Sequence, residues 1–151
     1  MTRRWMSTLW AFLRARRVVV RGWSMAPTLL PGDFLLVDTL AYHSHAPQRG
    51  DVVLARDPYA PHRLLVKRVV ALPGETVSED ADGLVHVSEQ GPPPTPTGRP
   101  LLRLGEGEYF LVGDVEALSR DSRSFGPVRR EGILGRAWLI YWPPGRWKRL
   151  A

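Results

Sequence analysis

Short runs of apolar and β-branched residues recur along this chain, and turns containing glycine or proline separate them. The chain has 14 glycines and 14 prolines in 151 residues, and both residue types interrupt regular structure and favour turns. Gly-Asp pairs at Gly32, Gly50 and Gly113 are interpreted as turns that open strands. The sequence therefore predicts an all-β, barrel-like domain of short antiparallel strands. The predicted strands cover residues 18–20, 34–38, 52–56, 64–72, 84–88, 108–112 and 133–142.

The composition fits a single domain with a hydrophobic core, because 44% of the residues are hydrophobic. No cysteine is present, which excludes disulfides, thiol catalysis and thiolate metal sites. A formal net charge of +6 favours an anionic partner, either a membrane surface or a nucleic acid. Charge alone does not choose between these two.

Residues 3–17 combine an apolar patch with basic ends and predict a short amphipathic helix. The apolar stretch is shorter than the roughly 20 residues that a membrane-spanning helix needs, and Arg14, Arg16 and Arg17 close it. A helix that lies on a membrane surface, with tryptophans at the interface, is the favoured interpretation. The alternative is an amphipathic helix packed on its own domain.

The stretch from Val20 to Leu29 contains the candidate nucleophile, Ser24. Residues 18–20 are all valine and predict a short buried strand, Gly22 permits close backbone approach, and Pro27 prevents strand pairing beyond it. Ser24 is therefore predicted at a junction between a strand and a turn, where its hydroxyl is accessible. A serine hydroxyl needs an adjacent base to act as a nucleophile.

The candidate base is Lys67, the lone lysine of the apolar run 64–72. The chain contains nineteen arginines and only two lysines, Lys67 and Lys148. Arginine keeps its proton, with a pKa of about 12 or more, whereas the pKa of a desolvated lysine falls from about 10.4 toward neutrality. Leu65, Lys67 and Val69 share one face of a strand, which predicts apolar surroundings for the amine.

Four sequence blocks resemble the successive boxes of the type I signal peptidases. They are Ser-Met-Ala-Pro-Thr-Leu at 24–29, Pro-Gly-Asp at 31–33, Val-Lys-Arg-Val-Val-Ala-Leu-Pro-Gly-Glu at 66–75, and Val-Gly-Asp, Ser-Arg-Asp-Ser-Arg and Gly-Pro-Val between 112 and 128. The resemblance covers residues 18–142. It implies a serine endopeptidase that removes signal peptides from exported preproteins after small residues, with Ser24 as nucleophile and Lys67 as general base.

The same resemblance implies supporting roles for four further residues. Ser119 would hydrogen-bond to the lysine and orient it. Asp121 and Arg123 would form a supporting ion pair, and Asp114 belongs to the same supporting group. These roles follow from the positions of the residues in the last of the matching blocks.

Two features depart from the family pattern. Many members have Gly-Asp-Asn-Arg where this chain has Gly-Asp-Val-Glu at 113–116, so the roles of that Asn and Arg are absent or replaced. Some members carry a serine two residues before the nucleophile that donates to the oxyanion, and this chain has Gly22 there. Stabilisation of the oxyanion would then rest on the Ser24 backbone N–H, with Gly22 and Met25 forming the strand beside the substrate.

The resemblance also implies a division of the chain and a location. Residues 1–17 form a basic amphipathic segment, 18–145 the peptidase domain with a proline-rich loop at 91–100, and 146–151 a basic tail. The implied partners are preprotein substrates and a membrane surface, without nucleic acid, cofactor or metal. The implied location is the cell membrane, with the catalytic domain outside the cytoplasm, and the lack of a full spanning helix leaves a soluble form open.

Other interpretations of the sequence stay open. A dedicated maturation protease of the same fold, such as that of nickel superoxide dismutase, agrees with the missing spanning helix. A basic β-barrel that binds nucleic acid through Arg and Trp explains the charge but not the lone lysine in an apolar strand. A Ser/His/Asp triad would use His62 or His86, and a metal site at His43 and His45 lacks a matching carboxylate.

Overall fold

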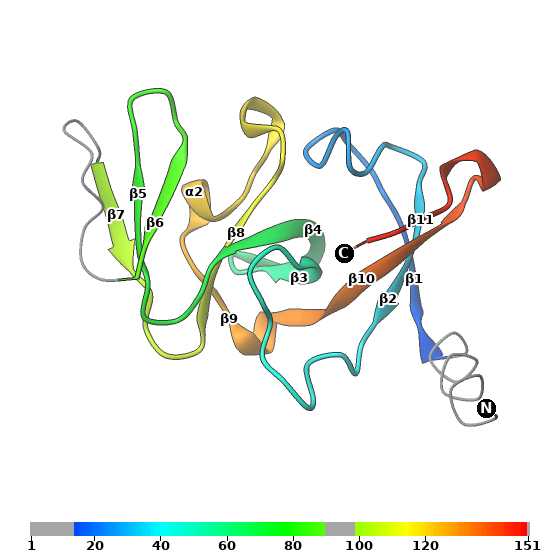
Figure 1. The fold of residues 1–151 in the computed structure, drawn as a ribbon, viewed down its shortest axis with the longest axis horizontal. Helices are drawn as coiled ribbons and strands as arrows, with labels where there is room; N and C mark the ends of the chain where they lie inside the picture. Colours follow the sequence, from blue (N-terminus) through cyan, green and yellow to red (C-terminus); the bar gives the residue numbers. More distant parts are fainter. Residues whose placement is uncertain (1–13, 90–98, 151) are drawn as a thin grey trace.

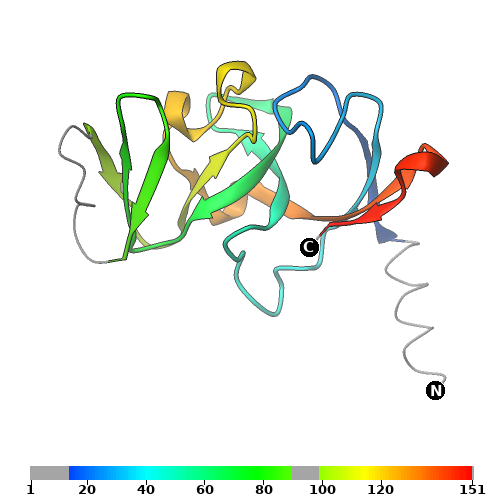
Figure 2. The same ribbon diagram turned by 45° about the horizontal axis from the view of Figure 1, so that its top comes forward.

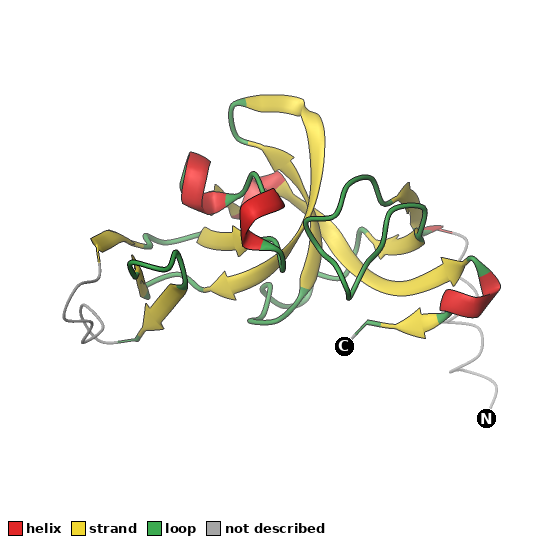
Figure 3. Cartoon of the chain, turned by 90° about the horizontal axis from the view of Figure 1, so that it is seen from above, coloured by secondary structure: helices red, strands yellow, loops and turns green. Residues whose placement is uncertain are grey.

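A computed structural model describes residues 14–89 and 99–150 of the chain. Short strands dominate this part of the molecule, and the few helices are single turns in the loops between them (Figure 3). The helical turns are η1 (Glu116–Leu118), α2 (Ser122–Phe125), η2 (Arg130–Gly132) and η3 (Pro144–Arg146). The strands are β1 (Arg16–Val19), β2 (Phe34–Asp38), β3 (Val52–Asp57), β4 (Ala60–Ala71), β5 (Thr76–Glu79), β6 (Val85–Ser88), β7 (Arg99–Arg103), β8 (Glu108–Val112), β9 (Val128–Arg129), β10 (Ile133–Trp142) and β11 (Lys148–Arg149).

The strands form two antiparallel sheets. The large sheet has the order β1-β2-β10-β3-β4-β8-β9, with β11 paired to β10, and the small sheet has the order β6-β5-β7. The small sheet lies at the opposite end of the molecule from β1 and β2 (Figures 1 and 2). Register shifts in the pairs that β10 makes with β2 and β3 mark bulges, which bend and twist a sheet. The predicted antiparallel β fold is confirmed, and within the described residues the large sheet ends at β1 and β9.

Strand β3 is the centre of the core because both of its faces are covered. Val52 and Leu54 belong to one buried cluster, and Val53 and Ala55, which alternate with them, belong to a second. Side chains of successive strand residues point to opposite faces, so a run of four apolar residues is compatible with a strand covered on both sides. A third cluster, which includes Val77 and Phe110, joins the small sheet to the large one.

Strand β1 differs from the strand predicted at residues 18–20. It begins at Arg16 and is partly exposed, with Val19 exposed to 43% and only Val20, just after the strand, fully buried. β1 has β2 as its partner on one side and lies at the end of the sheet order, which explains its exposure. The helix predicted over 3–17 lies mostly outside the described residues, but it does not reach its predicted end, because Arg16 and Arg17 pair in β1. Within residues 14–89 and 99–150, no helix has the length and apolar character to cross a bilayer.

Four strands were absent from the sequence prediction: β5, β7, β9 and β11. They are two to five residues long, too short to establish an apolar alternation, and they depend on pairing with neighbouring strands. Strand β7 includes Arg99 and Pro100, which the sequence analysis assigned to the proline-rich loop 91–100. The remainder of that loop lies outside the described residues.

The segment predicted as a basic tail, 146–151, is part of the domain as far as residue 150. Arg146 donates to both carboxylate oxygens of buried Asp33, at 3.1 and 2.7 Å. β11 pairs with β10, and Leu150, exposed to only 7%, joins the cluster that contains Ile140. A single leucine among charged residues carries no periodic signal, which is why the sequence did not reveal this packing.

The buried position of Leu150 predicts a clear stability difference. Leu150→Ala should lower the free energy of unfolding by about 2–4 kcal/mol, because it removes buried methyl groups and leaves a cavity. Trp147→Ala, at a position exposed to 70%, should change it by less than about 1 kcal/mol. Urea unfolding of both variants measures the difference, and equal losses would contradict the packing of the C-terminal segment.

Candidate active site

Ser24 lies in a wound turn that follows β1. The Ala26 N–H donates to Trp23 O at 3.0 Å, which closes a turn that contains Ser24. The Leu29 N–H donates to Met25 O at 2.8 Å, which closes a second turn directly after it. The side chain of Met25 is buried in the core and anchors the turn. Gly22 has a φ of +78°, and a Cβ placed on it would meet no atom within 4 Å. The left-handed backbone therefore favours glycine at this position. The predicted reason, close approach of another part of the backbone, does not apply within the protein.

Lys67 projects from β4, where it pairs with Val53 of β3. The residue is only 4% exposed, and Leu65 and Val69, predicted on the same face, belong to or pack against a buried apolar cluster. Its Nζ lies 2.8 Å from Ser24 Oγ and 3.1 Å from Ser119 Oγ. The two serines come from loops far apart in the sequence, and the lysine amine joins them.

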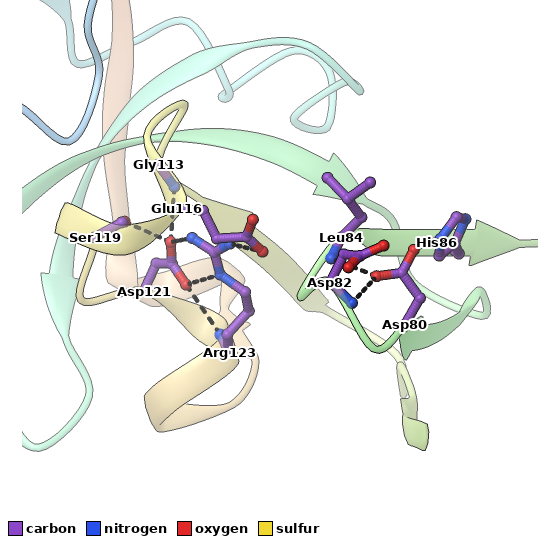
Figure 4. Close-up of polar contacts among 9 residues, drawn as sticks. All are labelled: Asp80, Asp82, Leu84, His86, Gly113, Glu116, Ser119, Asp121 and Arg123. Atoms are coloured by element: carbon purple, nitrogen blue, oxygen red, sulfur yellow. Dashed lines mark hydrogen bonds and ion pairs between the residues drawn. The ribbon is translucent and has the colours of Figure 1, made fainter. Parts of the chain in front are cut away.

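Asp121 continues this chain of contacts and is fully buried. Ser119 Oγ donates to Asp121 Oδ2, which also accepts the Gly113 N–H at 2.8 Å. Arg123 donates from Nε to Oδ1 at 3.0 Å and from Nη2 to Oδ2 at 2.7 Å. Figure 4 shows Asp121 at the centre of these bonds. The predicted ion pair of Asp121 and Arg123 is present in the structure.

The order of donors and acceptors restricts the Ser119 hydroxyl. An ionised carboxylate only accepts hydrogen bonds, whereas a hydroxyl has one proton and two lone pairs. Since Ser119 gives its proton to Asp121, its oxygen faces Lys67 as an acceptor. An amine that donates to Ser119 can direct a lone pair at Ser24 once the amine is neutral.

Burial and charge act together on the Lys67 amine. Desolvation lowers the pKa of Lys67 from its ordinary value; Asp121 opposes this shift, Arg123 adds to it, and Asp114 opposes it. Burial tends to raise the pKa of Asp121, but hydrogen bonds from Arg123, Ser119 and the Gly113 N–H outweigh it and lower the pKa overall. The site therefore combines an ionised carboxylate with an amine that loses its proton more easily than an exposed lysine does.

Asp114 attaches the loop after β8 to β4 beside the lysine. Arg68 donates to its two carboxylate oxygens, both at 2.9 Å, and also to Gly50 O at 3.0 Å. The pKa of Asp114 is lowered, because the bonds and charge of Arg68 outweigh its partial burial. Asp114 thus fixes the loop after β8 to Arg68 of β4. The structure shows no hydrogen bond between Asp114 and the Ser24 hydroxyl.

Gly113 is a site residue whose role the sequence analysis missed. A Cβ at this position would lie 2.2 Å from Ser119 Oγ and 2.7 Å from Ser24 O, so only glycine fits between the two serines. The Val115 N–H then donates to Ser24 O at 2.8 Å. Gly113 follows β8 and leads into η1, so it does not open a strand as Gly32 and Gly50 do.

A groove of about 320 Å³ lies beside Ser24 and Lys67. Its walls are the end of β1 with the following Arg21 on one side and residues 64–67 of β4 on the other, with Met25 and Leu54 also lining it. Most of these side chains are apolar. The groove can receive an extended chain whose backbone passes the Ser24 hydroxyl.

The alternative sites have different surroundings. His62 is exposed on β4, and His86 Nε2 lies 2.7 Å from Asp80 Oδ2 in the β5–β6 hairpin, so the structure joins Ser24 to a lysine and not to either histidine. Among the residues that the structure describes, no three His, Asp or Glu side chains are grouped so as to hold a metal ion.

The electrostatics of Asp121 predict a pH-dependent stability. Its pKa is lowered in the folded protein, so its contribution is complete above the unfolded value of about 3.9 and is lost as the pH falls through the folded value. Asp121→Asn should lower the free energy of unfolding at pH 7 by about 3 kcal/mol and flatten its decrease toward acid pH. Asp82→Asn, at an exposed position, is the control. Urea unfolding at pH 7 and at about pH 2, which lies below the unfolded value, tests this, and a pH dependence of Asp121→Asn equal to that of the parent would contradict it.

Comparison with known proteins assigns the family. Residues 5–142 match the family described as signal peptidase, peptidase S26. A probable signal peptidase I-1 of Synechocystis is 35% identical, and the match covers 84% of this chain and 71% of that protein. For signal peptidase I V of Bacillus subtilis the identity is 35% and the coverage 77% and 79%, and for the mitochondrial ATP-independent inner membrane protease subunit 1a of Arabidopsis thaliana it is 37%, with 83% and 69%. A crystal structure of a signal peptidase I from Enterococcus faecalis aligns with a TM-score of 0.49 and 26% identity over 60% of this chain and 95% of that one. The family match and the sequence relatives show that this chain belongs to the signal peptidase family, peptidase S26, and is a peptidase.

Proposed function

We propose that this chain is a serine endopeptidase of the signal peptidase I type, which cleaves signal peptides from exported preproteins. Ser24 is the nucleophile and Lys67 the general base. The observation that carries the proposal is the 2.8 Å contact between Lys67 Nζ and Ser24 Oγ, made by an amine that is buried and whose pKa is lowered. Family membership supports the same chemistry and favours it over a nucleic-acid-binding barrel.

In the proposed mechanism, neutral Lys67 takes the Ser24 proton as Oγ attacks the scissile carbonyl carbon. The resulting ammonium then gives that proton to the leaving amine, and the C–N bond breaks to leave an ester on Ser24. Water, deprotonated by Lys67, attacks the ester and releases the acid product, with Ser24 regaining its proton. Ser119 keeps the amine oriented through both halves of the reaction.

The developing oxyanion needs donors that are already in place. The Ser24 backbone N–H is the proposed donor, and Gly22 contributes no side-chain hydroxyl. The wound turn at 23–29, fixed by its backbone bonds and by buried Met25, supports this arrangement because it holds the Ser24 backbone rigid. We expect the oxyanion to form on the side of the turn that faces the groove.

The groove between β1 and β4 is the proposed substrate site. A peptide in extended form would pair with exposed backbone beside it, and the pairing would supply affinity while pockets select alternate side chains. Apolar walls such as Val18 and Leu65 leave room for small residues at the first and third positions before the cut. Preprotein substrates of this kind place the enzyme at a membrane, and we propose that the segment before β1 contacts the membrane surface while residues 16–150 form the peptidase domain.

Exchange of the proposed base predicts complete loss of cleavage. Lys67→Arg should be as inactive as Lys67→Ala, because a guanidinium stays protonated and cannot take the Ser24 proton. Lys148→Arg, the same exchange at the other lysine, should leave the rate unchanged. The assay is cleavage of a peptide with a small-x-small site, with Ser24→Ala as the inactive control. Appreciable cleavage by folded Lys67→Arg would exclude Lys67 as the base.

The lowered pKa of Lys67 predicts the pH dependence of this cleavage. The base must be neutral, so the rate should rise with pH through the pKa of Lys67 and reach its plateau below the pH at which an ordinary lysine, with a pKa of about 10.4, would lose its proton. Rates measured from pH 5 to pH 10 on one peptide give this profile. A rate that falls over the same range would contradict the role of a neutral amine.

The groove also predicts selectivity. Replacing Ala by Leu or Phe at the first position before the cut should reduce kcat/KM by about 100-fold or more, because the larger side chain cannot fit beside Ser24. Matched peptides that differ only at this position provide the measurement. Equal rates would contradict the pocket, whereas an intact site that cleaves no such peptide would favour the dedicated maturation protease.

A further inference from the structure

Arg123 is shared between two carboxylates. One is Asp121, which it binds through Nε and Nη2, and the other is Glu116, whose Oε1 lies 2.7 Å from Arg123 Nη1. The Arg123 side chain is only 10% exposed, whereas that of Glu116 is 38% exposed, so the buried guanidinium depends on these carboxylates to balance its charge. Figure 4 shows the Glu116 carboxylate beside the Arg123 guanidinium, which also contacts Asp121.

The Glu116 oxygen that contacts Arg123 also faces the turn between β5 and β6. A Cβ on Gly83 would come within 2.7 Å of Glu116 Oε1, and this oxygen is shielded from solvent. The turn is itself held by Asp80, whose carboxylate accepts the N–H groups of Asp82 and Leu84 and contacts His86. The β5–β6 turn of the small sheet thus packs against the Glu116 carboxylate of the Glu116–Arg123 ion pair.

Glu116 is also close to Ser119 along the chain. Both residues belong to the loop around η1, and the Ser119 N–H donates to Glu116 O at 3.2 Å. The side chain of Glu116 therefore ties this loop to Arg123 at the start of α2.

We propose that Glu116 is a positioning residue for the reaction: it holds Arg123 against Asp121, and through Asp121 and Ser119 it keeps Lys67 directed at Ser24. The β5–β6 turn is its outer support, so the small sheet contributes to the active site without touching substrate. The inference rests on the proposed Ser24–Lys67 chemistry.

The first test compares Glu116→Gln with Glu131→Gln, a matched exchange at an exposed position. In Glu116→Gln, kcat should fall about 10-fold with little change in KM, because the base is misplaced while the groove is intact. The pKa of Lys67 should also fall, since Glu116 no longer balances the charge of Arg123, while Asp121 and Asp114 remain. Glu116→Asp keeps the charge and should restore the parent pKa, and Glu131→Gln should match the parent throughout.

The pKa of Lys67 can be read without an activity assay. In protein labelled with [13Cε]lysine, only Lys67 and Lys148 give lysine signals. Lys67→Arg removes the Lys67 signal and so assigns it, and Ser24→Ala, which changes the surroundings of Lys67, should shift the same signal. An unchanged Lys67 pKa in Glu116→Gln, or a loss of kcat that only follows the fraction of folded protein, would overturn the proposal. Failure of the parent to cleave peptides would instead refute the proposed function, and the NMR titration would still decide whether Glu116 acts on Lys67.

A second test uses the turn that supports Glu116. Gly83 and Gly74 have similar left-handed φ values of +82° and +86°, but a Cβ on Gly74 meets no atom within 4 Å. Gly83→Ala should therefore lower kcat more than Gly74→Ala, because only its methyl group displaces the Glu116 carboxylate. In a Glu116→Ala background the two alanine substitutions should have equal effects, and a persistent difference would overturn the role of the turn.

Discussion

The buried amine of Lys67 is the constraint on which the rest of the structure depends. Removing an ammonium group from water is costly, and a protein meets this cost with partners or with loss of the proton. Here the partners are two neutral hydroxyls, those of Ser24 and Ser119, and desolvation lowers the pKa of the Lys67 amine. β3 and β4 supply the burial, and the loops after β1 and β8 supply the hydroxyls. The proposed catalytic arrangement is thus a direct result of where the core is covered.

Asp121 is linked to Lys67 through Ser119 and not by direct contact, and this separation affects the pKa of the amine. A carboxylate in direct contact with the amine would favour the ammonium form and oppose its use as a base. Ser119 separates the two groups. Because its one proton is donated to Asp121, its oxygen accepts from Lys67 and orients the amine. Arg123 balances the charge of Asp121, and Glu116 in turn contacts Arg123. Asp121, Arg123 and Glu116 thus form a row of charges of alternating sign that begins near the amine. Each charge partly cancels the electrostatic effect of the one before it on the pKa of Lys67.

The parts of the fold that could be predicted from sequence are those with a sustained apolar pattern. β2, β8 and β10 begin and end at the predicted residues, since leucine, β-branched and aromatic residues make up most of each strand. β5 and β11 could not be predicted, because their few residues are mostly polar and their place depends on strand pairing and, in β5, on the burial of the single residue Val77. Ser24 and Lys67 could be singled out from the family resemblance and the scarcity of lysine. Gly113 and Glu116 could not, because their roles depend on contacts with Ser119 and Gly83 that only the tertiary structure creates.

The position of β1 has a consequence for the protein in the absence of substrate. In the described part of the chain, β1 is hydrogen-bonded on one edge only, and an open strand edge can recruit the same strand of another molecule. Arg16 and Arg17 are both exposed on β1, and their charges repel an identical edge while leaving uncharged extended peptides free to approach. These basic residues thus disfavour self-association through the open edge of β1, and they leave an unpaired strand available beside Ser24, the proposed nucleophile.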